Sequence, residues 1–528
     1  MGCLRRPCCG IGQLACLTLI AVAGYADDTY VPTPQPVAGS VNVGCYYFPV
    51  HYHALRWRPM AESGGPKPLI GYYDGGSPEV LDWHVKFAVE HGIRFFVFDW
   101  YYDHQTDSVS SLNAGIDAFL ASRYGGLMQF SLMWCNENGT PYAEPQLVRM
   151  TEAIAERYLS HTNFLKVDGR PVLWVSRPLH LLDVLGVDGL RDAVRSMNAK
   201  LEEHGHAPFF LVANTNERYD ELVAAGFEAV SAYNYPQAGM DPAGKSAPYS
   251  DMVTGIQDVW AKVVKESPLP YIVPVSPGWD SRPWYGDNAL VRTGSTPDLY
   301  AEMCRASLRY VDPQLNMVIA ECWNEFGEGS YVEPTAQFGF GMLDAMRSVF
   351  CPDAGPHTDV TPAELGRTVP NFEPVPSLTS ADIVAQGGNL LYNPGAERPW
   401  GWQHYDGTAV ERTRENPHAG EWCLAMPPER GGMKSLWVVP CEPEKAYRVS
   451  AFVRCAPGAS ATMKVAPFAN ESSWTGRYID IASSGSEDWA EVSGEVTCPD
   501  DSTYLSVEFI GTGGTVWVDD VSAIPVSP

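Results

Sequence analysis

The sequence is poor in charge, and basic residues are its scarcest charged class. Only 19% of the 528 residues are charged, and 36 Lys and Arg stand against 63 Asp and Glu, which gives a formal net charge of -27 at pH 7. A nucleic acid needs clustered basic groups, so this balance argues against nucleic acid as a partner. A neutral polymer such as a polysaccharide remains compatible with it.

Familiar metal and phosphate patterns are also missing. The sequence has no CxxC or HExxH spacing, which argues against a zinc site of those kinds. The first strand-like segment, VNVGCYYFPVHYH, is not followed by a Gly-rich phosphate loop, which disfavours a doubly wound, dinucleotide-binding sheet. We therefore expect no cofactor in catalysis.

The clearest targeting signal lies in residues 1–26. Arg5 and Arg6 precede an apolar run that ends in small residues at Ala26, a pattern typical of a secretory signal peptide and too short for a membrane-spanning helix. We expect a secreted or periplasmic protein that begins near Asp27 and has no spanning segment after cleavage. A lipoprotein anchored at Cys16 is the alternative.

Four of the 13 cysteines lie in this leader, so an odd number remains and at least one thiol has no intramolecular disulfide partner. Three cysteines inside apolar runs are expected to be buried thiols, namely Cys45, Cys135 and Cys322. Export would permit disulfides among four others whose pairing the sequence leaves open, namely Cys423, Cys441, Cys455 and Cys498.

Strand-like and helix-like segments alternate from Val41 to about Phe350. This alternation predicts an α/β fold, a (β/α)₈ TIM barrel over residues 27–352. The eight predicted strands are Val41–Phe48, Arg94–Trp100, Met128–Asn136, Arg170–Arg177, Phe209–Thr215, Ala229–Tyr235, Tyr271–Trp279 and Met317–Glu325.

The pattern changes after the barrel. Residues 353–388 are rich in Pro, Thr, Asp and Ser and are predicted to form a linker. In residues 389–528, runs such as YRVSAFVR and TVWVDDVS alternate apolar and polar residues, which predicts an all-β sandwich domain.

The predicted strand ends combine amides, carboxylates and aromatic rings, which suits the hydroxyl groups and apolar faces of sugars. In a (β/α)₈ barrel the carboxyl ends of the strands gather at the active-site face. The candidate substrate-binding residues are Tyr46, Tyr47, Asp99, Trp100, Trp134, Asn136, Glu137, Tyr233, Trp279, Asp280, Arg282, Trp323 and Asn324.

The segment MVIAECWNEFGEGSYVEPT, Met317 to Thr335, contains the candidate catalytic pair. Glu325 and Glu328 lie three residues apart after an apolar strand, and glycosidic cleavage usually requires two carboxyl groups around the bond. Gly327 and Gly329 allow the tight turn that would let the two side chains converge.

Over the barrel the chain resembles glycoside hydrolase family 99, the endo-α-mannosidases and endo-α-mannanases, and the related WbsX-like proteins. The resemblance rests on seven ordered motifs: YYFP at Tyr46–Pro49, GYYD at Gly71–Asp74, HGIRFFVFDWYY at His91–Tyr102, MWCNEN at Met133–Asn138, VDGRPVLW at Val167–Trp174, PGWDSRPW at Pro277–Trp284 and WNEFGEGSYVEP at Trp323–Pro334.

This resemblance implies roles for the two carboxylates. Glu325 would act on the sugar 2-hydroxyl and Glu328 as acid and base, in retaining hydrolysis through a 1,2-anhydro sugar. The chain departs from the hydrolase motif at Phe326 and Gly327, where that family has Trp and His, and so comes closer to the WbsX-like group.

The last domain resembles galactose-binding-like carbohydrate-binding modules through NLLYNPGAE at Asn389–Glu397 and VWVDDVS at Val516–Ser522. Such modules often hold a structural calcium, which makes Glu397 and Asp520 candidate ligands. The alternative is that Asp520 belongs to an acidic pair that merely ends a strand.

Together these features predict an exported hydrolase of α-linked, mannan-like poly- or oligosaccharides that is expected to be endo-acting. Two alternatives stay open: a WbsX-like glycosyltransferase of polysaccharide synthesis, and a glycan-binding protein without catalytic activity.

Overall fold

The computed structural model describes residues 30–49, 54–62, 64–103, 107–136, 143–371, 380–397, 401–405, 410–435, 438–470 and 473–526. Eight parallel strands form one sheet in the order β11-β13-β1-β2-β5-β7-β8-β9. These strands are β1 (Asn42–Tyr47), β2 (Ile93–Trp100), β5 (Gln129–Trp134), β7 (Arg170–Val175), β8 (Phe210–Asn214), β9 (Ala229–Ser231), β11 (Val273–Val275) and β13 (Met317–Ala320).

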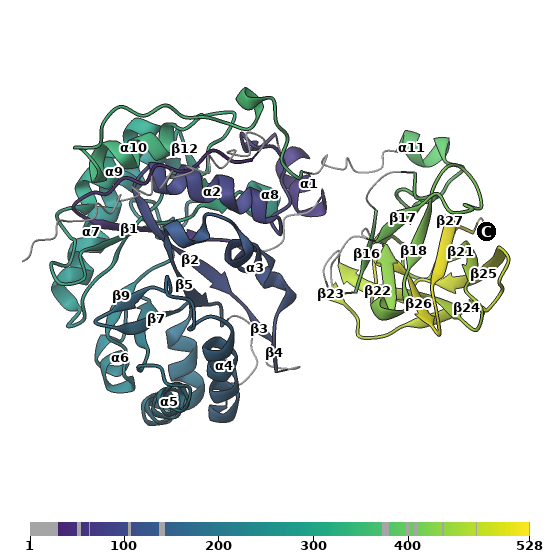
Figure 1. Ribbon diagram of the computed structural model, residues 1–528, viewed down its shortest axis with the longest axis horizontal. Helices are drawn as coiled ribbons and strands as arrows, with labels where there is room; N and C mark the ends of the chain where they lie inside the picture. The colour runs from purple at the N-terminus through teal and green to yellow at the C-terminus, as the bar shows by residue number, and fades with distance from the viewer. Residues whose placement is uncertain are drawn as a thin grey trace, which may run out of the picture.

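A parallel bridge between Val230 and Tyr271 joins the two edges of this sheet, so the strands form a nearly closed barrel. A helix follows each strand along the chain. Figure 1 shows these helices around the outside of the sheet. These helices are α2 (Pro78–Glu90), α3 (Ala114–Ala121), α4 (Glu144–Arg157), α5 (Pro178–Glu203), α6 (Tyr219–Ala225), α7 (Tyr249–Glu266), α9 (Pro297–Ser307) and α10 (Gly341–Phe350).

The barrel prediction is therefore confirmed, and each of the eight predicted strands corresponds to an observed one. Shorter elements decorate the loops: α1 (Ala54–Glu62), α8 (Arg282–Tyr285), β3 (Tyr102–Asp103), β4 (Ser108–Val109), β6 (Lys166–Val167), β10 (Ser246–Pro248), β12 (Val291–Thr293), β14 (Asn324–Glu325) and β15 (Ser330–Tyr331).

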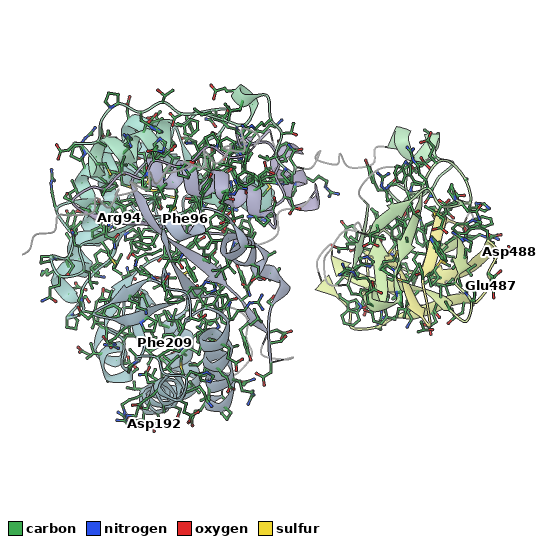
Figure 2. All side chains as sticks on the ribbon, viewed as in Figure 1. Arg94, Phe96, Asp192, Phe209, Glu487 and Asp488 are labelled. Atoms are coloured by element: carbon green, nitrogen blue, oxygen red, sulfur yellow. A yellow bond between two sulfur atoms is a disulfide. The ribbon has the colours of Figure 1, made fainter. Side chains whose placement is uncertain are left out.

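Successive side chains of β2 alternate between two cores. Phe95 and Val97 belong to the cluster inside the barrel, whereas Phe96 and Phe98 belong to the larger cluster between the sheet and the helices. Figure 2 shows Phe96 within the barrel region and Asp192 at its outer edge. This alternation follows from the two-residue period of a strand, and it decides which strand-end residues can face the barrel axis.

The last predicted strand, Met317–Glu325, is shorter in the structure. Its parallel pairing with β1 ends at Ala320, opposite Cys45. The chain then turns, and Asn324 and Glu325 pair antiparallel with Tyr331 and Ser330. A hairpin of this kind cannot continue a parallel sheet, so the candidate carboxylates lie on a loop beyond the strand.

After the barrel the chain forms antiparallel sheets, as the sequence predicts. One has the order β16-β19-β26-β22-β23, with β20 and β24 also paired to it, and the other has the order β17-β18-β27-β21-β25. The elements are α11 (Ser380–Ala385), β16 (Trp402–His404), β17 (Glu411–Thr413), β18 (Cys423–Met426), β19 (Gly432–Ser435), β20 (Val439–Pro440), β21 (Ala446–Cys455), β22 (Ser460–Asn470), β23 (Ser473–Trp474), β24 (Ile479–Ser484), β25 (Ala490–Thr497), β26 (Tyr504–Thr512) and β27 (Val516–Pro525).

Both antiparallel sheets contribute to one apolar cluster, with Val465 and Phe509 from the first sheet and Val449 and Val518 from the second. A disulfide joins Cys441 to Cys498, which answers the pairing that the sequence leaves open. The described part of the chain contains no helix that is both long and apolar enough to cross a membrane.

Candidate active site

Two carboxylates meet one tyrosine at the carboxyl end of the barrel. The hydroxyl of Tyr233, just after β9, lies 3.3 Å from Oδ2 of Asp99 on β2 and 3.5 Å from Oε2 of Glu325 on β14. Asp99 and Glu325 are 4% and 5% exposed, so neither carboxylate is surrounded by water. The fold thus brings together three of the predicted site residues from distant parts of the chain.

Tyr233 is a hydrogen-bond donor in this arrangement. Burial raises the pKa of its phenol well above the ordinary value, and the negative charge of Asp99 raises this pKa further. The phenol therefore stays protonated at neutral pH, but its single proton can serve only one carboxylate at a time.

A third carboxylate, Glu321, is not among the site residues that the sequence predicts. It lies one residue beyond β13, is fully buried, and accepts hydrogen bonds from Ser276 (2.7 Å), Ser330 (2.8 Å) and Asn234 (3.2 Å). Burial raises its pKa to about 7, although the three hydrogen bonds oppose that shift. Glu321 therefore underlies the hairpin that carries Glu325 and connects it to β9 and β11.

Glu321 predicts a specific dependence of stability on pH. Its pKa in the folded protein is above the ordinary value of 4.5, so between about pH 4.5 and 7 the folded protein holds a proton that the unfolded chain has released. Stability should consequently fall as pH rises through this range. In Glu321→Gln, the unfolding free energy should fall less between pH 5 and 8 than in the wild type. Equal slopes in denaturant titrations of the two proteins would contradict this prediction.

The β14–β15 hairpin is tightly turned between the two candidate catalytic residues. The amide of Glu328 donates to the carbonyl of Glu325 (3.2 Å), and the carbonyl of Glu328 accepts from the amide of Asp280 (2.7 Å). Gly329 has φ +67°, and a Cβ there would lie 2.5 Å from the Asp280 nitrogen. Glycine is therefore required at this position both by the turn and by the close approach of the Asp280 backbone.

Gly327 is the position at which the sequence departs from the hydrolase motif, and Trp284 occupies the adjacent space. A Cβ on residue 327 would lie 1.7 Å from Nε1 of the Trp284 indole. The indole therefore fills the space that a larger residue at 327 would need. The departure from the motif is thus matched by an aromatic ring contributed by a different loop.

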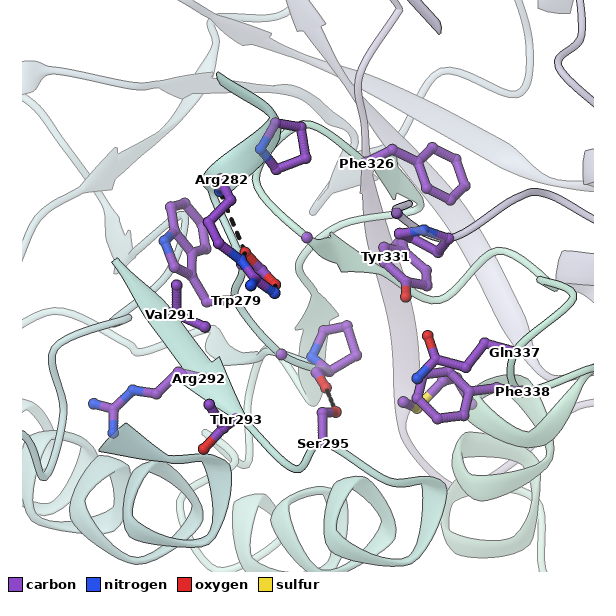
Figure 3. Close-up of a pocket in the computed structure, with 18 of the residues that line it drawn as sticks. Trp279, Arg282, Val291, Arg292, Thr293, Ser295, Phe326, Tyr331, Gln337 and Phe338 are labelled. Carbon is purple, nitrogen blue, oxygen red and sulfur yellow. Dashed lines mark hydrogen bonds and ion pairs between the residues drawn. The ribbon is translucent and has the colours of Figure 1, made fainter. Parts of the chain in front are cut away.

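A cavity of about 830 Å³ borders this hairpin on the side of Phe326, Gly329 and Tyr331. Figure 3 shows Trp279, Arg282 and Tyr331 around it, with Arg282 paired to Asp280. The described residues that line it do not include Glu325 or Glu328. Trp279, Asp280 and Arg282 thus belong to this neighbouring cavity rather than to the Asp99–Tyr233–Glu325 cluster.

A second, smaller hollow of about 340 Å³ includes Tyr233 itself, together with Asn214, Asn234 and Ser176. Tyr46 lies beneath it: its hydroxyl donates to Asn214 (3.1 Å), and its ring centroid is 4.9 Å from that of Tyr233. Asn214 and Asn234 follow the same strand-end signal as the predicted residues. They extend the polar surface that a sugar could contact.

Several predicted substrate-binding residues lie elsewhere. Four belong to the core between the sheet and the helices, namely Tyr47, Trp100, Trp134 and Trp323. Asn136 and Asn324 bond to backbone groups of Arg177 and Phe48 and so connect strand ends. Glu137 lies outside the described residues.

The two candidate calcium ligands both have protein partners. Oε1 of Glu397 accepts from the amides of Glu421 (2.9 Å) and Trp422 (3.2 Å), and Oδ2 of Asp520 lies 2.6 Å from Nδ1 of His418. These contacts account for the positions of both carboxylates without an ion. The calcium site stays a prediction.

Solved structures with similarity to the chain include a glycoside hydrolase-like protein, at 17% identity and a TM-score of 0.45 over 61% of this chain and 98% of that one. The GH99 endo-α-mannosidase of Bacteroides thetaiotaomicron in complex with bis-tris-propane matches at 14% identity and a TM-score of 0.44, over 59% and 96%. The CBM22-1 xylan-binding domain of Paenibacillus barcinonensis Xyn10C matches at 16% identity and a TM-score of 0.21, over 24% and 87%. These values are too low to transfer function.

Among curated proteins, the chain is similar to WxcX of Xanthomonas campestris pv. campestris, a protein described as uncharacterized. The identity is 25% over 305 residues, which cover 53% of this chain and 42% of the relative. The chain thus matches less than half of that protein's length. The family model described as glycosyltransferase WbsX matches residues 65–346, which include β2 to β13, Asp99, Tyr233 and both candidate catalytic residues. Because this match spans more than half of the chain, the protein belongs to the WbsX glycosyltransferase family.

Proposed function

We propose that the barrel hydrolyses α-linked, mannan-like glycans with Glu325 and Glu328. Membership in the WbsX family supports the more general conclusion that the barrel processes glycans. The observation that carries the proposal is Glu325 itself, which is 5% exposed, lies within reach of the Tyr233 hydroxyl, and is held on a turn that also contains Glu328. The mannan-like substrate class rests on the seven-motif resemblance.

In the proposed reaction, Glu325 removes the proton of the sugar 2-hydroxyl while O2 attacks C1. Glu328 donates a proton to the leaving glycosidic oxygen, so the glycosidic bond breaks as a 1,2-anhydro sugar forms. Glu328 then takes a proton from water, which opens the anhydro ring with net retention, and Glu325 returns its proton to O2. Glu325 suits the first role because the Tyr233 hydroxyl can support its negative charge.

The description of the family as glycosyltransferases favours a second candidate function. A transferase would move a sugar from an activated donor to an acceptor, whereas a hydrolase needs only the glycan and water. The two candidates therefore differ in whether an activated donor is required. They also differ in place, since nucleotide-sugar donors are cytoplasmic and the leader pattern predicts export.

The deciding experiment incubates the purified protein with α-mannans and other bacterial or algal polysaccharides, and measures new reducing ends. We expect reducing ends to appear without any nucleotide sugar, and product lengths will separate endo from exo cleavage. Product formation only when a nucleotide sugar is added would refute hydrolysis and support transfer. The same assay on periplasmic, external and cytoplasmic fractions of the native host tests the proposed export.

We further propose that the sheet containing β22 and β26 binds glycan through its outer face. Trp474 and Tyr478 are 47% and 46% exposed, with ring centroids 5.0 Å apart. Lys464 lies 5.5 Å from the Tyr478 ring and forms an ion pair with Asp480 at 3.4 Å. Exposed rings beside paired charges can stack on a sugar ring and bond its hydroxyls.

Trp474→Ala in the full chain should weaken binding to insoluble glycan about 5- to 10-fold, as expected for the loss of one ring contact. Trp517→Ala is the matched control, because Trp517 lies on the other sheet, where Arg454 stacks 4.0 Å from its ring. Pull-down with the glycan measures both variants. An equal loss in the two variants would contradict a binding face on the first sheet.

A further inference from the structure

Two histidines and an aspartate converge on the side of the barrel opposite the candidate active site. His91 directly follows α2 and lies two residues before β2, and His357 and Asp359 lie on the segment after α10. Oδ1 of Asp359 is 3.1 Å from Nε2 of His357 and 3.3 Å from Nε2 of His91. All three atoms lie within 4.8 Å of one another.

These three atoms are buried without a hydrogen-bond partner among the described residues. An unsatisfied buried polar group is costly, and three in one place call for an explanation. The contacts of both imidazoles with Asp359 are close enough for ion pairs. A positive charge at the centre of the three atoms would satisfy all of them at once.

The ring of His91 is already oriented for such a role. Its Nδ1 lies 2.7 Å from the carbonyl of Phe87, which can only accept, so Nδ1 carries a proton and donates it. Phe340 stacks on the same ring, with centroids 5.7 Å apart and an interplanar angle of 13°. A histidine that binds a metal through one nitrogen commonly donates its other N–H to a backbone carbonyl in this way.

The spacing fits a small transition-metal ion. Tetrahedral Zn²⁺ has ligand distances of about 2.0 to 2.1 Å, which places neighbouring ligand atoms about 3.3 Å apart. Asp359 lies 3.1 and 3.3 Å from the two imidazole nitrogens. Two imidazoles favour zinc or a related ion over Ca²⁺ or Mg²⁺, which prefer oxygen ligands.

A fourth ligand would have to come from one of two carboxylates whose oxygens lie outside that three-atom group. Oδ1 of Asp344 on α10 lies 3.5 Å from Nε2 of His91, and Oε2 of Glu90 lies 3.6 Å from Nε2 of His357. Glu90 is already paired with Lys86, at 2.5 Å, whereas the side chain of Asp344 is 56% exposed. Asp344 is therefore the better candidate, and its exposure gives an ion a path from solvent.

We propose that His91, His357 and Asp359, with Asp344 as the fourth ligand, form a structural Zn²⁺ site. The ion would fasten the segment after α10 to the end of α2 and to α10 itself. Binding at the amino-terminal side of the strands, away from Glu325, implies a role in stability rather than in cleavage. The site is independent of the proposed hydrolase function.

A second group of ligand-type side chains provides an internal comparison. Glu152, Glu156 and His204 also approach one another, but Glu156 is exposed and Lys200 lies 3.7 Å from Glu152. None of its ligand atoms is among the described buried atoms that lack a partner. His204→Gln is therefore a matched control that removes a histidine from a solvated cluster.

The test uses the full chain without a histidine tag, stripped with a chelator and then titrated with Zn²⁺. We expect one ion per chain by calorimetry and elemental analysis, and an increase in Tm of about 5 °C at a hundredfold excess over Kd. His357→Gln and Asp359→Asn should each weaken binding at least tenfold and reduce this increase. His204→Gln should leave both unchanged.

Co²⁺ provides a second readout that distinguishes this site from the free cysteines. Bound at His91, His357, Asp359 and Asp344, it should give the visible bands of a tetrahedral ion without the near-ultraviolet charge transfer of a thiolate ligand. Those bands should be lost in His357→Gln. Absence of stoichiometric Zn²⁺ binding, a thiolate band, or equal binding by wild type and His357→Gln would overturn the proposal and leave an ion-pair cluster.

Discussion

Glu328→Gln and Glu325→Gln should each lower the rate of glycan hydrolysis by about 10² to 10⁴-fold, the usual contribution of a general acid or base. Glutamine keeps the volume of the side chain and its ability to form hydrogen bonds but cannot exchange a proton, so folding and glycan binding should change little. Initial rates, circular dichroism and binding of the uncleaved substrate measure the three properties. Glu202→Gln, an exposed change on α5, is the control for the substitution itself.

The two variants should differ with an activated substrate. A very good leaving group needs little protonation, so it should partly restore the first step in Glu328→Gln. Glu325→Gln should stay slow, because the 2-hydroxyl still lacks its base. If a 2-deoxy or 2-fluoro substrate were cleaved as fast as the parent sugar, O2 would not participate, and a two-carboxylate mechanism through a glycosyl-enzyme would replace the proposed one.

Gly327→Ala should reduce kcat/KM by about 10²-fold or more, although the substitution adds only one methyl group. The added Cβ would lie 1.7 Å from Nε1 of Trp284, so either the indole or the hairpin must move. Residue 327 lies between the two candidate catalytic residues, and a displacement of about 1 Å at such a position can cost 10²-fold in rate. Steady-state kinetics and Tm of the purified variant measure the effect.

The double variant Trp284→Ala, Gly327→Ala separates steric displacement from a need for glycine's backbone freedom. If the indole is the obstacle, Gly327→Ala should cost much less in the Trp284→Ala background than alone, which is a strong coupling between the two positions. Gly339→Ala is unsuitable as a control because its φ of +57° would itself be strained. Gly126→Ala, with open space around its Cβ, is the appropriate one. Additive effects of 284 and 327 would contradict the steric explanation.

Much of the barrel could be predicted from the sequence because burial leaves a local record. Each strand of the barrel is an apolar run of a few residues, and each helix presents apolar residues to the sheet at its own period. The hairpin motif was also recognisable, because Glu325, Glu328 and the two glycines are close in the chain. The antiparallel sheets after the barrel follow from alternating runs for the same reason.

The direction of side chains at the strand ends was harder to predict. Tyr46 and Tyr47 are neighbours on β1, and the two-residue period of a strand means that only one of them can face the barrel axis. The structure turns Tyr46 inward, toward Tyr233, and leaves Tyr47 bonded to His84 on α2. Strand alternation alone shows that two neighbouring residues cannot both face the barrel axis. Which of the two faces it depends on the register of the whole barrel.

The sequence pattern does not indicate Glu321, because it predicts a last barrel strand that continues to Glu325. An apolar strand that continued to Glu325 would make Glu321 an ordinary strand residue, whereas the observed strand ends at Ala320. Its hydrogen-bond donors come from three other segments, Asn234, Ser276 and Ser330. No local pattern could reveal that these donors converge on one buried carboxylate.

By itself, the sequence determined the succession of strands and helices and the presence of two nearby glutamates, because both are encoded in the spacing of residues along the chain. Only the tertiary structure decided that Asp99 and Glu325 both approach the Tyr233 hydroxyl. It also decided that Trp284 fills the space beside Gly327, and that His91 lies close to His357 and Asp359. Such contacts join residues that are far apart in the chain. Closure of the barrel sets their distances, and closure depends on the packing of all eight strands at once.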